Sequence, residues 1–209
     1  MKIRKAVVAA ATAVTMVVAP AVALAPSAQA TPVSLAEVLA ADAKKNGKPS
    51  FDKNKKDFDI LYGAVTTVLA AKPDSAVALL ADPTARLTAF IPNDKAFART
   101  AGELGIEAKN EKRLLNKLAR TLGVDGVEDV LLYHVVPGKK LTSKKVAKAD
   151  GASLMMANGG TVKVNIRDNG NIKLRATGPA TNPRVIAVDV NKKKGNKQVA
   201  HVINKVLLP

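Results

Sequence analysis

The sequence predicts an α+β domain, with helices in the first half of the chain and antiparallel strands in the second. Over residues 59–69 and 110–122, apolar side chains return every three or four positions, which is the period of an amphipathic helix. Later the period changes to two, because Val162, Val164 and Ile166 alternate with polar residues as in a strand with one buried face. Asn158-Gly159 lies just before this alternation and predicts a tight hairpin turn.

Local signals place the first helices. Ser34 and Glu37 have the spacing of a capping box, which predicts a helix over residues 35–43. The polar, Lys-rich stretch that follows is expected to be a surface loop. Asp59 is expected to cap a second helix, and Pro73 is expected to open a short third one.

The clearest helical period covers residues 110–122 and is expected to end at Gly123. The chain is then expected to continue, helically or as an extended turn, through residues 127–136. Ser143 is expected to cap one more helical turn over residues 143–149.

Between these helices, a short run of branched residues over 87–91 predicts a buried strand, which Pro92 ends. Asn93 or Asp94 is expected to cap a helix that buries Phe97. The remaining strands are expected over residues 154–156, 162–166, 172–174, 185–190 and 199–208.

Three segments resemble the signatures of the fasciclin domain family, in the family's order. Residues 131–138 are similar to its central Tyr-His motif, and residues 201–209 are similar to its closing signature. The first signature has the form Thr-x-Phe-x-Pro-x-Asp-x-Ala-Phe. Its fixed positions are all matched, by Thr88, Phe90, Pro92, Asp94, Ala96 and Phe97.

This resemblance implies the fasciclin fold, a wedge-shaped antiparallel β-sandwich with helices packed along one edge. It also implies that Tyr133 and His134 belong to a structural hydrogen-bond network near the first and last signatures, the latter of which contains His201.

One departure from the family stands just before the closing signature. Lys197 and Gln198 occupy positions where the family usually has Asn-Gly. We therefore expect a rearranged loop, with Gly195-Asn196 as a shifted turn.

The first thirty residues have the features of a secretory signal peptide. The start is basic, residues 6–18 are uncharged and apolar, and Ala28-Gln29-Ala30 is typical of a signal peptidase site, so cleavage is expected before Thr31. The apolar run is short for a membrane span, and its alanine-rich character indicates a bacterial source. The predicted organisation is a signal peptide over 1–30, an N-terminal helix with a Lys-rich surface loop over 31–58, and a fasciclin-like domain over 59–209.

The composition is strongly basic and free of cysteine. The chain has 33 Lys and Arg against 17 Asp and Glu, a formal net charge of +16 that favours anionic partners. The absence of cysteine excludes disulfides, thiolate metal sites and a cysteine nucleophile. Aromatic residues make up only 3% of the chain, so stacking platforms are scarce and nucleic acid is not expected as the physiological partner.

We predict no catalytic, cofactor-binding or metal-ligating residue. His134 and His201 are the two histidines of the chain, and each lies among apolar residues, where a buried, hydrogen-bonded ring is expected. A Ser-His-Asp triad stays open because such groups assemble in space, although no Gly-x-Ser-x-Gly elbow is present. Solvated helix faces are expected to explain the acidic residues Glu103, Glu107, Glu111, Glu128 and Asp129.

Two groups of lysines are the remaining candidates, one after the Tyr-His motif and one before the closing signature. Each is expected to be a solvated loop or, if the two groups meet on one face, a binding surface for an anionic polymer. The candidate anion-binding residues are Lys139, Lys140, Lys144, Lys145, Lys192, Lys193, Lys194 and Lys197, with Lys148 beside the first group.

The resemblance implies a secreted, non-enzymatic adhesion or cell-surface interaction module, extracellular or associated with the cell wall. Its partner would be an unknown extracellular protein or an anionic polysaccharide. The alternative is an electrostatic binder of anionic wall polymers or small anionic ligands, and a hydrolase is a remote alternative.

Overall fold

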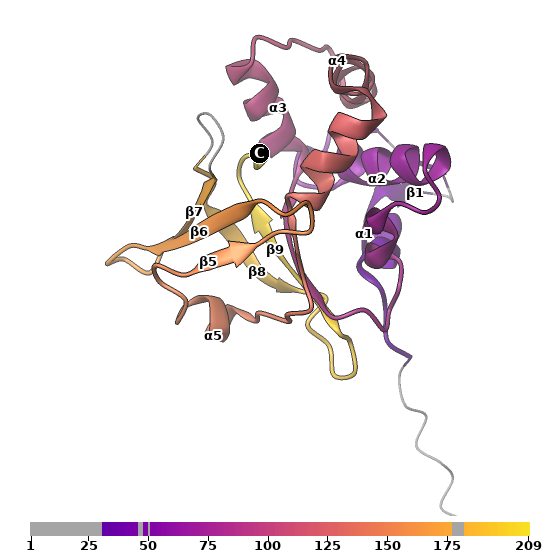
Figure 1. Cartoon of the computed structure of the whole chain (residues 1–209). Helices are drawn as coiled ribbons and strands as arrows, with labels where there is room; N and C mark the ends of the chain where they lie inside the picture. Colours follow the sequence, from indigo (N-terminus) through magenta and orange to yellow (C-terminus); the bar gives the residue numbers. More distant parts are fainter. Residues whose placement is uncertain (1–30, 46–47, 50, 177–181) are drawn as a thin grey trace, which may run out of the picture.

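The computed structural model describes residues 31–45, 48–49, 51–176 and 182–209. Helices α1 to α4 gather on one side of the molecule and most strands on the other (Figure 1). The helices are α1 (Leu35–Ala43), α2 (Asp59–Ala71), the 3₁₀ helix η1 (Ala76–Leu80), α3 (Asp94–Glu103), α4 (Glu111–Leu132) and α5 (Ser143–Val146). The strands are β1 (Lys44–Lys45), β2 (Lys48–Pro49), β3 (Leu87–Pro92), β4 (Val135–Pro137), β5 (Ser153–Met155), β6 (Thr161–Ile166), β7 (Ile172–Ala176), β8 (Val185–Val190) and β9 (Gln198–Ile203).

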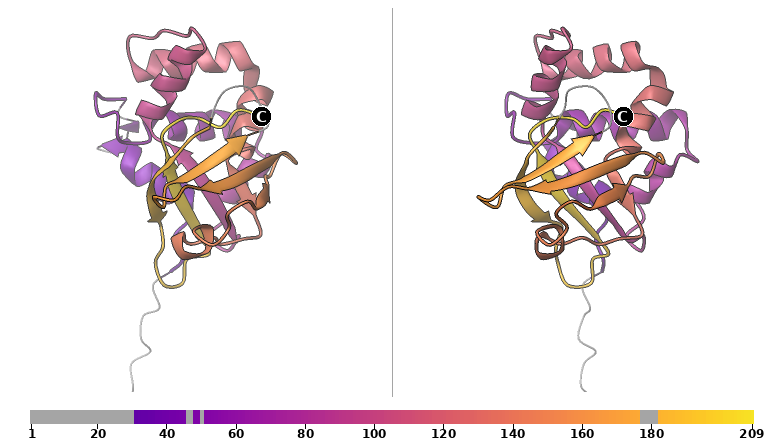
Figure 2. Two further views of the ribbon diagram at one scale, coloured as in Figure 1. Left: turned by 90° about the vertical axis from the view of Figure 1, so that its left-hand side faces the viewer. Right: turned by 60° about the vertical axis from the view of Figure 1, so that its left-hand side comes forward.

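Two sheets form an open sandwich, which confirms the predicted α+β class. The larger sheet has the strand order β4-β3-β9-β8, and the smaller has the order β5-β6-β7 (Figure 2). Among the described strand pairs, β3–β9 is parallel and the others are antiparallel. The exception is possible because the long connection between the first and last motifs returns the chain to the same end of the sheet.

Strand β3 is buried on both faces, which explains why all of its residues except Thr88 are apolar. Leu87, Ala89 and Ile91 belong to the core beneath the helices. Phe90, which points to the opposite face, belongs with Ile203 to the core between the two sheets. The first motif is therefore the strand that joins both cores.

Several predicted boundaries are confirmed. At α1, the Ser34 hydroxyl accepts a hydrogen bond from the Glu37 backbone at 3.2 Å, and Glu37 accepts one from the Ser34 backbone at 2.8 Å. The side chain of Asn93 caps α3 by accepting from the Ala96 backbone at 3.0 Å. Gly123 interrupts α4 with a φ of 69°, a conformation that glycine adopts without strain.

Two helix starts differ from the prediction. Asp59 does not cap α2 but is its first residue, and the Ile60 backbone N–H instead donates to Asp94 at 3.0 Å. Ser143 likewise is the first residue of α5, after Thr142. At each of these helix starts, a carboxylate distant in sequence accepts a backbone N–H of the first turn. Asp94 accepts from Ile60 in α2, and Asp189 accepts from Ser143 in α5.

The helix predicted at Pro73 is the 3₁₀ helix η1, which starts three residues later. Ser75 caps it by accepting from the Val77 backbone at 3.1 Å. The last predicted strand is shorter than expected, because β9 ends at Ile203. Beyond it, Val206 donates its backbone N–H to Thr100 on α3 instead of to a neighbouring strand.

The loop predicted before α2 is only partly a surface loop. It contains the paired strands β1 and β2, and Asp57 near its end is buried. The predicted signal peptide lies outside the described residues, so it and the proposed domain boundaries remain predictions. Within the part of the chain that the structure describes, no helix has the length and apolar character to cross a membrane.

Candidate functional site

The motif residue Thr88 holds the chain segment that follows β4. Its hydroxyl donates to the backbone oxygen of Lys139 at 2.6 Å and accepts from the backbone N–H of Leu141 at 2.8 Å. Because Thr88 is fully buried in β3, these bonds fix the first lysine group against the central sheet.

His201 connects the same segment to the end of strand β8, just before the β8–β9 loop. Its Nε2 lies 2.7 Å from the backbone oxygen of Leu141, and its Nδ1 lies 3.4 Å from the backbone nitrogen of Asp189. With Nε2 protonated and Nδ1 accepting, the neutral ring satisfies both contacts. Burial lowers the pKa of His201, in agreement with a neutral ring.

Asp189 joins the two lysine-bearing segments directly. Its carboxylate accepts from the Ser143 backbone at 2.7 Å, from the Ser143 hydroxyl at 2.5 Å and from Lys192 at 2.6 Å. Burial opposes ionisation here, but the hydrogen bonds from Lys192 and Ser143 prevail and lower the pKa of Asp189 to about 2. The carboxylate therefore stays charged and ties α5 to the β8–β9 loop.

We call the surface formed by Arg86, Lys140 and the four lysines of the β8–β9 loop, Lys192, Lys193, Lys194 and Lys197, the basic end. Burial lowers the pKa of Lys140, and so do the positive charges of Arg86, Lys197 and Lys192, which each lie close enough to Lys140 to act on it. The ammonium group of Lys140 also donates to the backbone oxygen of Asn196 in the second loop. The two lysine groups predicted from the sequence thus meet in space.

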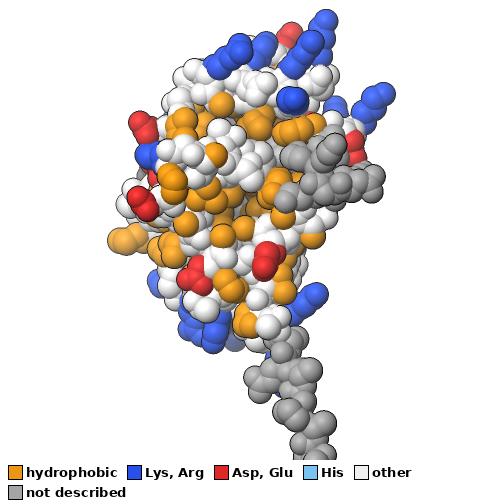
Figure 3. Space-filling view, turned by 90° about the vertical axis from the view of Figure 1, so that its right-hand side faces the viewer, with side chains coloured by type: hydrophobic (Ala, Val, Ile, Leu, Met, Phe, Trp, Pro, Cys, Tyr) orange, Lys and Arg blue, Asp and Glu red, His pale blue; other side chains and the backbone are white. Residues whose placement is uncertain are grey.

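The predicted anion-binding lysines lie in the same two segments. Lys139, Lys144, Lys145 and Lys148 follow β4 and are exposed, as are Lys193 and Lys194 in the β8–β9 loop. In Figure 3, Lys and Arg side chains gather at the lower end of the molecule and again at the upper end.

This arrangement is not that of a Ser-His-Asp triad. The Ser143 hydroxyl donates directly to Asp189, and His201 meets the backbone of Asp189 instead of the serine. A nucleophile needs a base within hydrogen-bond reach to remove its proton. The geometry at these three residues therefore gives no support to the hydrolase alternative.

The Tyr-His motif lies at the junction of the helices and sheets. His134 is buried, its Nδ1 lies 2.6 Å from the Val130 backbone oxygen, and its Nε2 accepts from the Leu207 backbone at 2.9 Å. Burial lowers the pKa of His134 to about 4, so the ring is neutral near pH 7. The Tyr133 hydroxyl donates to the Thr161 backbone at 2.9 Å.

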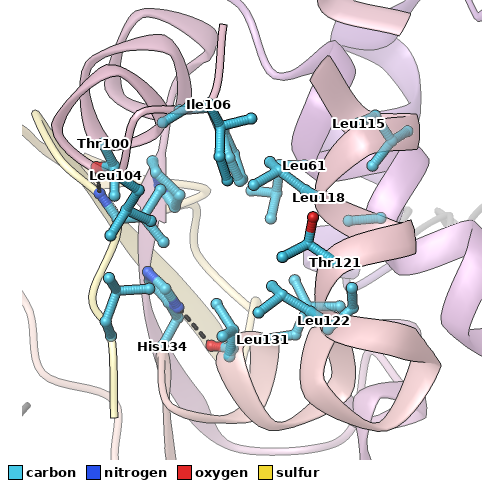
Figure 4. A pocket seen from close by; sticks show the side chains of 18 residues that line it. Leu61, Thr100, Leu104, Ile106, Leu115, Leu118, Thr121, Leu122, Leu131 and His134 are labelled. Atoms are coloured by element: carbon cyan, nitrogen blue, oxygen red, sulfur yellow. Dashed lines mark hydrogen bonds between the residues drawn. The ribbon is translucent and has the colours of Figure 1, made fainter. Parts of the chain in front are cut away.

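An apolar cavity of about 440 Å³ opens among α2, α3, α4 and the C-terminal residues. Figure 4 shows side chains of facing helices pointing into it, with His134 at one wall. Leu104 and Leu122 are lining residues that are 53% and 43% exposed. The cavity is suited to a hydrocarbon group and not to a small anion.

Besides the basic end and the apolar cavity, the structure contains a cluster of carboxylates at the point where α2, α3 and α4 begin. It consists of Asp52, Asp57, Asp59, Asp94 and Glu111. Burial, with further contributions from Asp57 and Glu111, raises the pKa of Asp94 well above its usual range. Burial and the charge of Asp57 raise the pKa of Glu111 to about 7.

The prediction of a solvated helix face is therefore wrong for Glu111, which is only 9% exposed. It is the first residue of α4 and faces the carboxylates of two other helices. Glu128 is half-buried and accepts from Ser75 at 2.5 Å as well as from Lys72. Periodicity alone did not reveal these contacts because the partners come from other elements.

The structure also places residues that the sequence analysis missed. Arg86 precedes β3 and joins the basic end, although no local pattern distinguishes it. Gln198 was noted only as a departure from the family. Its buried side chain accepts from the Leu35 backbone at 2.6 Å and donates to the backbone oxygens of Leu79 and Asp82 at 2.9 and 2.7 Å.

Asn196, two residues before Gln198, makes a similar contact with the segment before α1. Its side chain accepts from the Val33 backbone at 2.9 Å and donates to the Asn191 backbone at 3.1 Å. The predicted turn is present, since Gly195 has a φ of 94° and Asn196 donates to Lys193 at 3.3 Å. The rearranged loop thus holds the segment that leads into α1.

Comparisons with known proteins agree with this architecture. The model of a family described as Fasciclin domain matches residues 63–209. A solved structure of similar fold is the FAS1 domain pair from the insect cell adhesion molecule Fasciclin I, with 16% sequence identity and a TM-score of 0.53. The match covers 86% of this chain and 52% of that structure, so the chain spans about half its length. A comparison with curated protein sequences gave no match.

Proposed function

The chain belongs to the fasciclin family, and from this premise we propose that it is exported and acts as a non-enzymatic interaction module that holds an anionic polymer at its basic end. Fasciclin domains are cell-adhesion-type modules in homologues and are typically extracellular or at the cell surface. The proposal assigns this chain an acidic polysaccharide of the cell envelope as its partner.

The observation that supports this proposal is the meeting of the two lysine groups. Lys140 lies among Arg86, Lys192 and Lys197, although these residues come from three separate segments. The hydrogen bonds of Thr88, His201 and Asp189 hold those segments in place. A preformed cationic surface binds a polyanion with little further loss of conformational freedom.

The experiment is a binding titration with dextran sulfate and polygalacturonate, with neutral dextran as the control polymer. We compare the wild-type protein with the triple variant Lys193→Glu, Lys194→Glu, Lys197→Glu, which leaves the Lys192–Asp189 ion pair intact. The variant should bind less tightly and show a flatter dependence on salt, because fewer counterions are exchanged. Its stability should stay within about 0.5 kcal/mol of wild type.

A second triple variant provides the matched control. Lys112→Glu, Arg120→Glu and Lys163→Glu change the net charge equally at exposed positions outside the basic end. If both variants lose affinity equally, binding reflects net charge alone and the basic end is not the site. Selective binding that persists at about 0.5 M NaCl favours adhesion, whereas broad binding lost at that salt favours the purely electrostatic alternative.

Export has a separate test. Protein recovered from the culture medium should begin at Thr31, as the Ala28-Gln29-Ala30 site predicts. Recovery only from the cytoplasm, with Met1 in place, would contradict this part of the proposal and leave the family assignment unchanged.

The apolar cavity favours a second candidate function, the binding of the hydrocarbon chain of an amphiphile. Its lining is mostly apolar, and its volume of about 440 Å³ is within the range of small-molecule sites. Thr121 lines the cavity and is exposed, so Thr121→Phe should narrow it without disturbing the core.

This second candidate can be tested by displacement of a fluorescent fatty acid. Thr121→Phe should weaken binding about tenfold or more, whereas Thr66→Phe, at an exposed position of α2, should bind as wild type does. Equal binding by both variants would remove the cavity from consideration.

A further inference from the structure

Three helices begin at one point of the molecule, and each begins with an acidic residue. Asp59, Asp94 and Glu111 are the first residues of α2, α3 and α4. One carboxylate oxygen from each lies within 4.8 Å of the others, and all three residues are buried. Such an assembly is unusual in a chain with a formal net charge of +16, where 17 acidic residues face 33 basic ones.

The segment before α2 adds two further carboxylates. Asp52, Asp57 and Asp59 form a second group, whose ligand oxygens also lie within 4.8 Å of one another, so Asp59 belongs to both. The Asp52 backbone donates to Asp59 at 3.2 Å, and the Asp94 backbone donates to the Asp57 backbone oxygen at 3.1 Å. These two backbone hydrogen bonds hold the segment before α2 against the starts of α2 and α3, so the carboxylates stay close together.

Three carboxylate oxygens in this cluster are buried and have no hydrogen-bond partner among the residues that the structure describes. They are Oδ1 of Asp57, Oδ2 of Asp94 and Oε2 of Glu111, on residues that are 5%, 1% and 9% exposed. Buried polar atoms in native proteins are normally satisfied, and unsatisfied ones indicate an ion or water that completes the site. Because these three atoms can only accept when ionised, any group that satisfies them must be a cation or a hydrogen-bond donor.

We propose that the cluster of Asp52, Asp57, Asp59, Asp94 and Glu111 binds a divalent cation, and that calcium is the ion it fits. The site would join the starts of α2, α3 and α4 to the segment that precedes α2. This inference does not depend on the proposed polymer-binding function.

The donor set supports a hard cation. Five carboxylates offer oxygen atoms alone, whereas zinc sites usually include sulfur or nitrogen ligands from Cys or His. Calcium accepts six to eight oxygens in flexible geometry, which suits carboxylates supplied by a loop and three separate helices. Magnesium requires near-ideal octahedral geometry and retains water, so a crowded all-carboxylate site suits it less well.

A route to the cluster is also present. A hollow of about 650 Å³ is lined by Asp52, Asp94 and Glu111, together with Lys53 and Lys55. The two lysines are exposed and their charges oppose a cation, which favours moderate over very tight affinity. The alternative occupant is a proton shared between neighbouring carboxyl groups, since Asp57 lies within hydrogen-bonding reach of Asp94.

The experiment measures calcium binding by the purified protein after treatment with a chelator. Isothermal titration with CaCl₂ should give saturable binding, and the melting temperature should rise by about 3 °C or more at saturation. NaCl of equal ionic strength is the reference, because screening of the net positive charge also changes stability. MgCl₂ is titrated in parallel.

Two conservative variants and one control locate the site. Asp94→Asn retains an oxygen to accept from Ile60 and removes one charge, and Glu111→Gln is nearly isosteric. Both should fold, melt higher than wild type without calcium, and lose the response to calcium. Glu107→Gln removes the same charge from an exposed position nearby and should respond as wild type does.

Each outcome is decisive. A calcium response in wild type and Glu107→Gln that is absent in both site variants supports the proposal. Absence of any saturable calcium or magnesium binding in wild type overturns it and leaves the shared proton as the occupant. An undiminished response in Asp94→Asn and Glu111→Gln overturns the location, and a response to magnesium but not to calcium overturns the choice of ion.

Discussion

The imidazole Nε2 of His134 accepts a hydrogen bond of 2.9 Å from the backbone N–H of Leu207. The opposite ring nitrogen bonds to the Val130 backbone oxygen, so the ring bridges the last turn of α4 and the C-terminal segment. Leu207 is fully buried and belongs to the core between the two sheets. One neutral side chain thereby secures the end of the chain against the centre of the fold.

The first prediction concerns the loss of this bridge. His134→Ala leaves the Leu207 N–H and the Val130 oxygen without their partner, and a buried unsatisfied group costs about 1–3 kcal/mol. Thermal unfolding should therefore show a clearly lower melting temperature. A variant that keeps its melting temperature but loses polymer binding would show instead that His134 acts in binding.

The second prediction is a loss of stability in mild acid that depends on His134. Its pKa in the folded protein is lowered to about 4, against 6.5 for the unfolded chain. The neutral, buried ring of His134 therefore contributes its full stabilisation above pH 6.5. As the pH falls from 6.5 towards 4, the free energy of unfolding decreases by about 3 kcal/mol in total. Denaturant unfolding of wild type and His134→Asn across this range measures the difference.

The comparison with His134→Asn is needed because other groups titrate in the folded protein. The lowered pKa of His201 acts in the same direction, whereas the raised pKa values of Asp94 and Glu111 act in the opposite one. These contributions are common to both proteins and cancel in the difference. Parallel curves for the two proteins would contradict a neutral, buried His134.

The features that the sequence predicted are mostly local. The capping box at Ser34, the interruption at Gly123 and the turn at Gly195 each depend on residues within a few positions of one another. Alternation identified β6 in the same way, because one of its faces is buried and the other is exposed. Such signals can be read without knowledge of the tertiary structure.

The features that the sequence did not predict depend on contacts between residues far apart in the chain. The parallel pairing of β3 with β9 joins segments about a hundred residues apart, and no local pattern gives the direction of a pair. Asp59 matched a helix cap, and its true neighbours Asp94 and Glu111 begin other helices. Arg86 reaches the basic end by the same kind of long-range contact.

The third prediction concerns the close approach of Gly160 to Tyr133. A Cβ atom at Gly160 would lie 2.7 Å from the ring of Tyr133, which is fully buried and cannot move away freely. Gly160→Ala should therefore destabilise the protein by about 1–3 kcal/mol, as overpacking of a core does. Among the described residues, a Cβ atom at Gly102 on α3 would meet no atom within 4 Å, so Gly102→Ala should be neutral or stabilising. Equal melting temperatures for these two variants would contradict the packing described at Tyr133.

The last prediction is that Gln198 secures α1 to the domain. Its side chain is fully buried and bonds to the Leu35 backbone at the start of α1, while its amide group holds the backbone oxygens of Leu79 and Asp82. Gln198→Ala leaves these groups unsatisfied and should cost about 3 kcal/mol, with a selective loss of hydrogen-exchange protection in α1. Lys197→Ala, at the exposed neighbouring position, is the control and should change neither quantity. If the protection of α1 is unaltered in Gln198→Ala, the apolar contacts of Leu35 and Leu39 are enough to hold α1 on the domain. In that case Gln198, a departure from the family pattern, would have no structural role at α1.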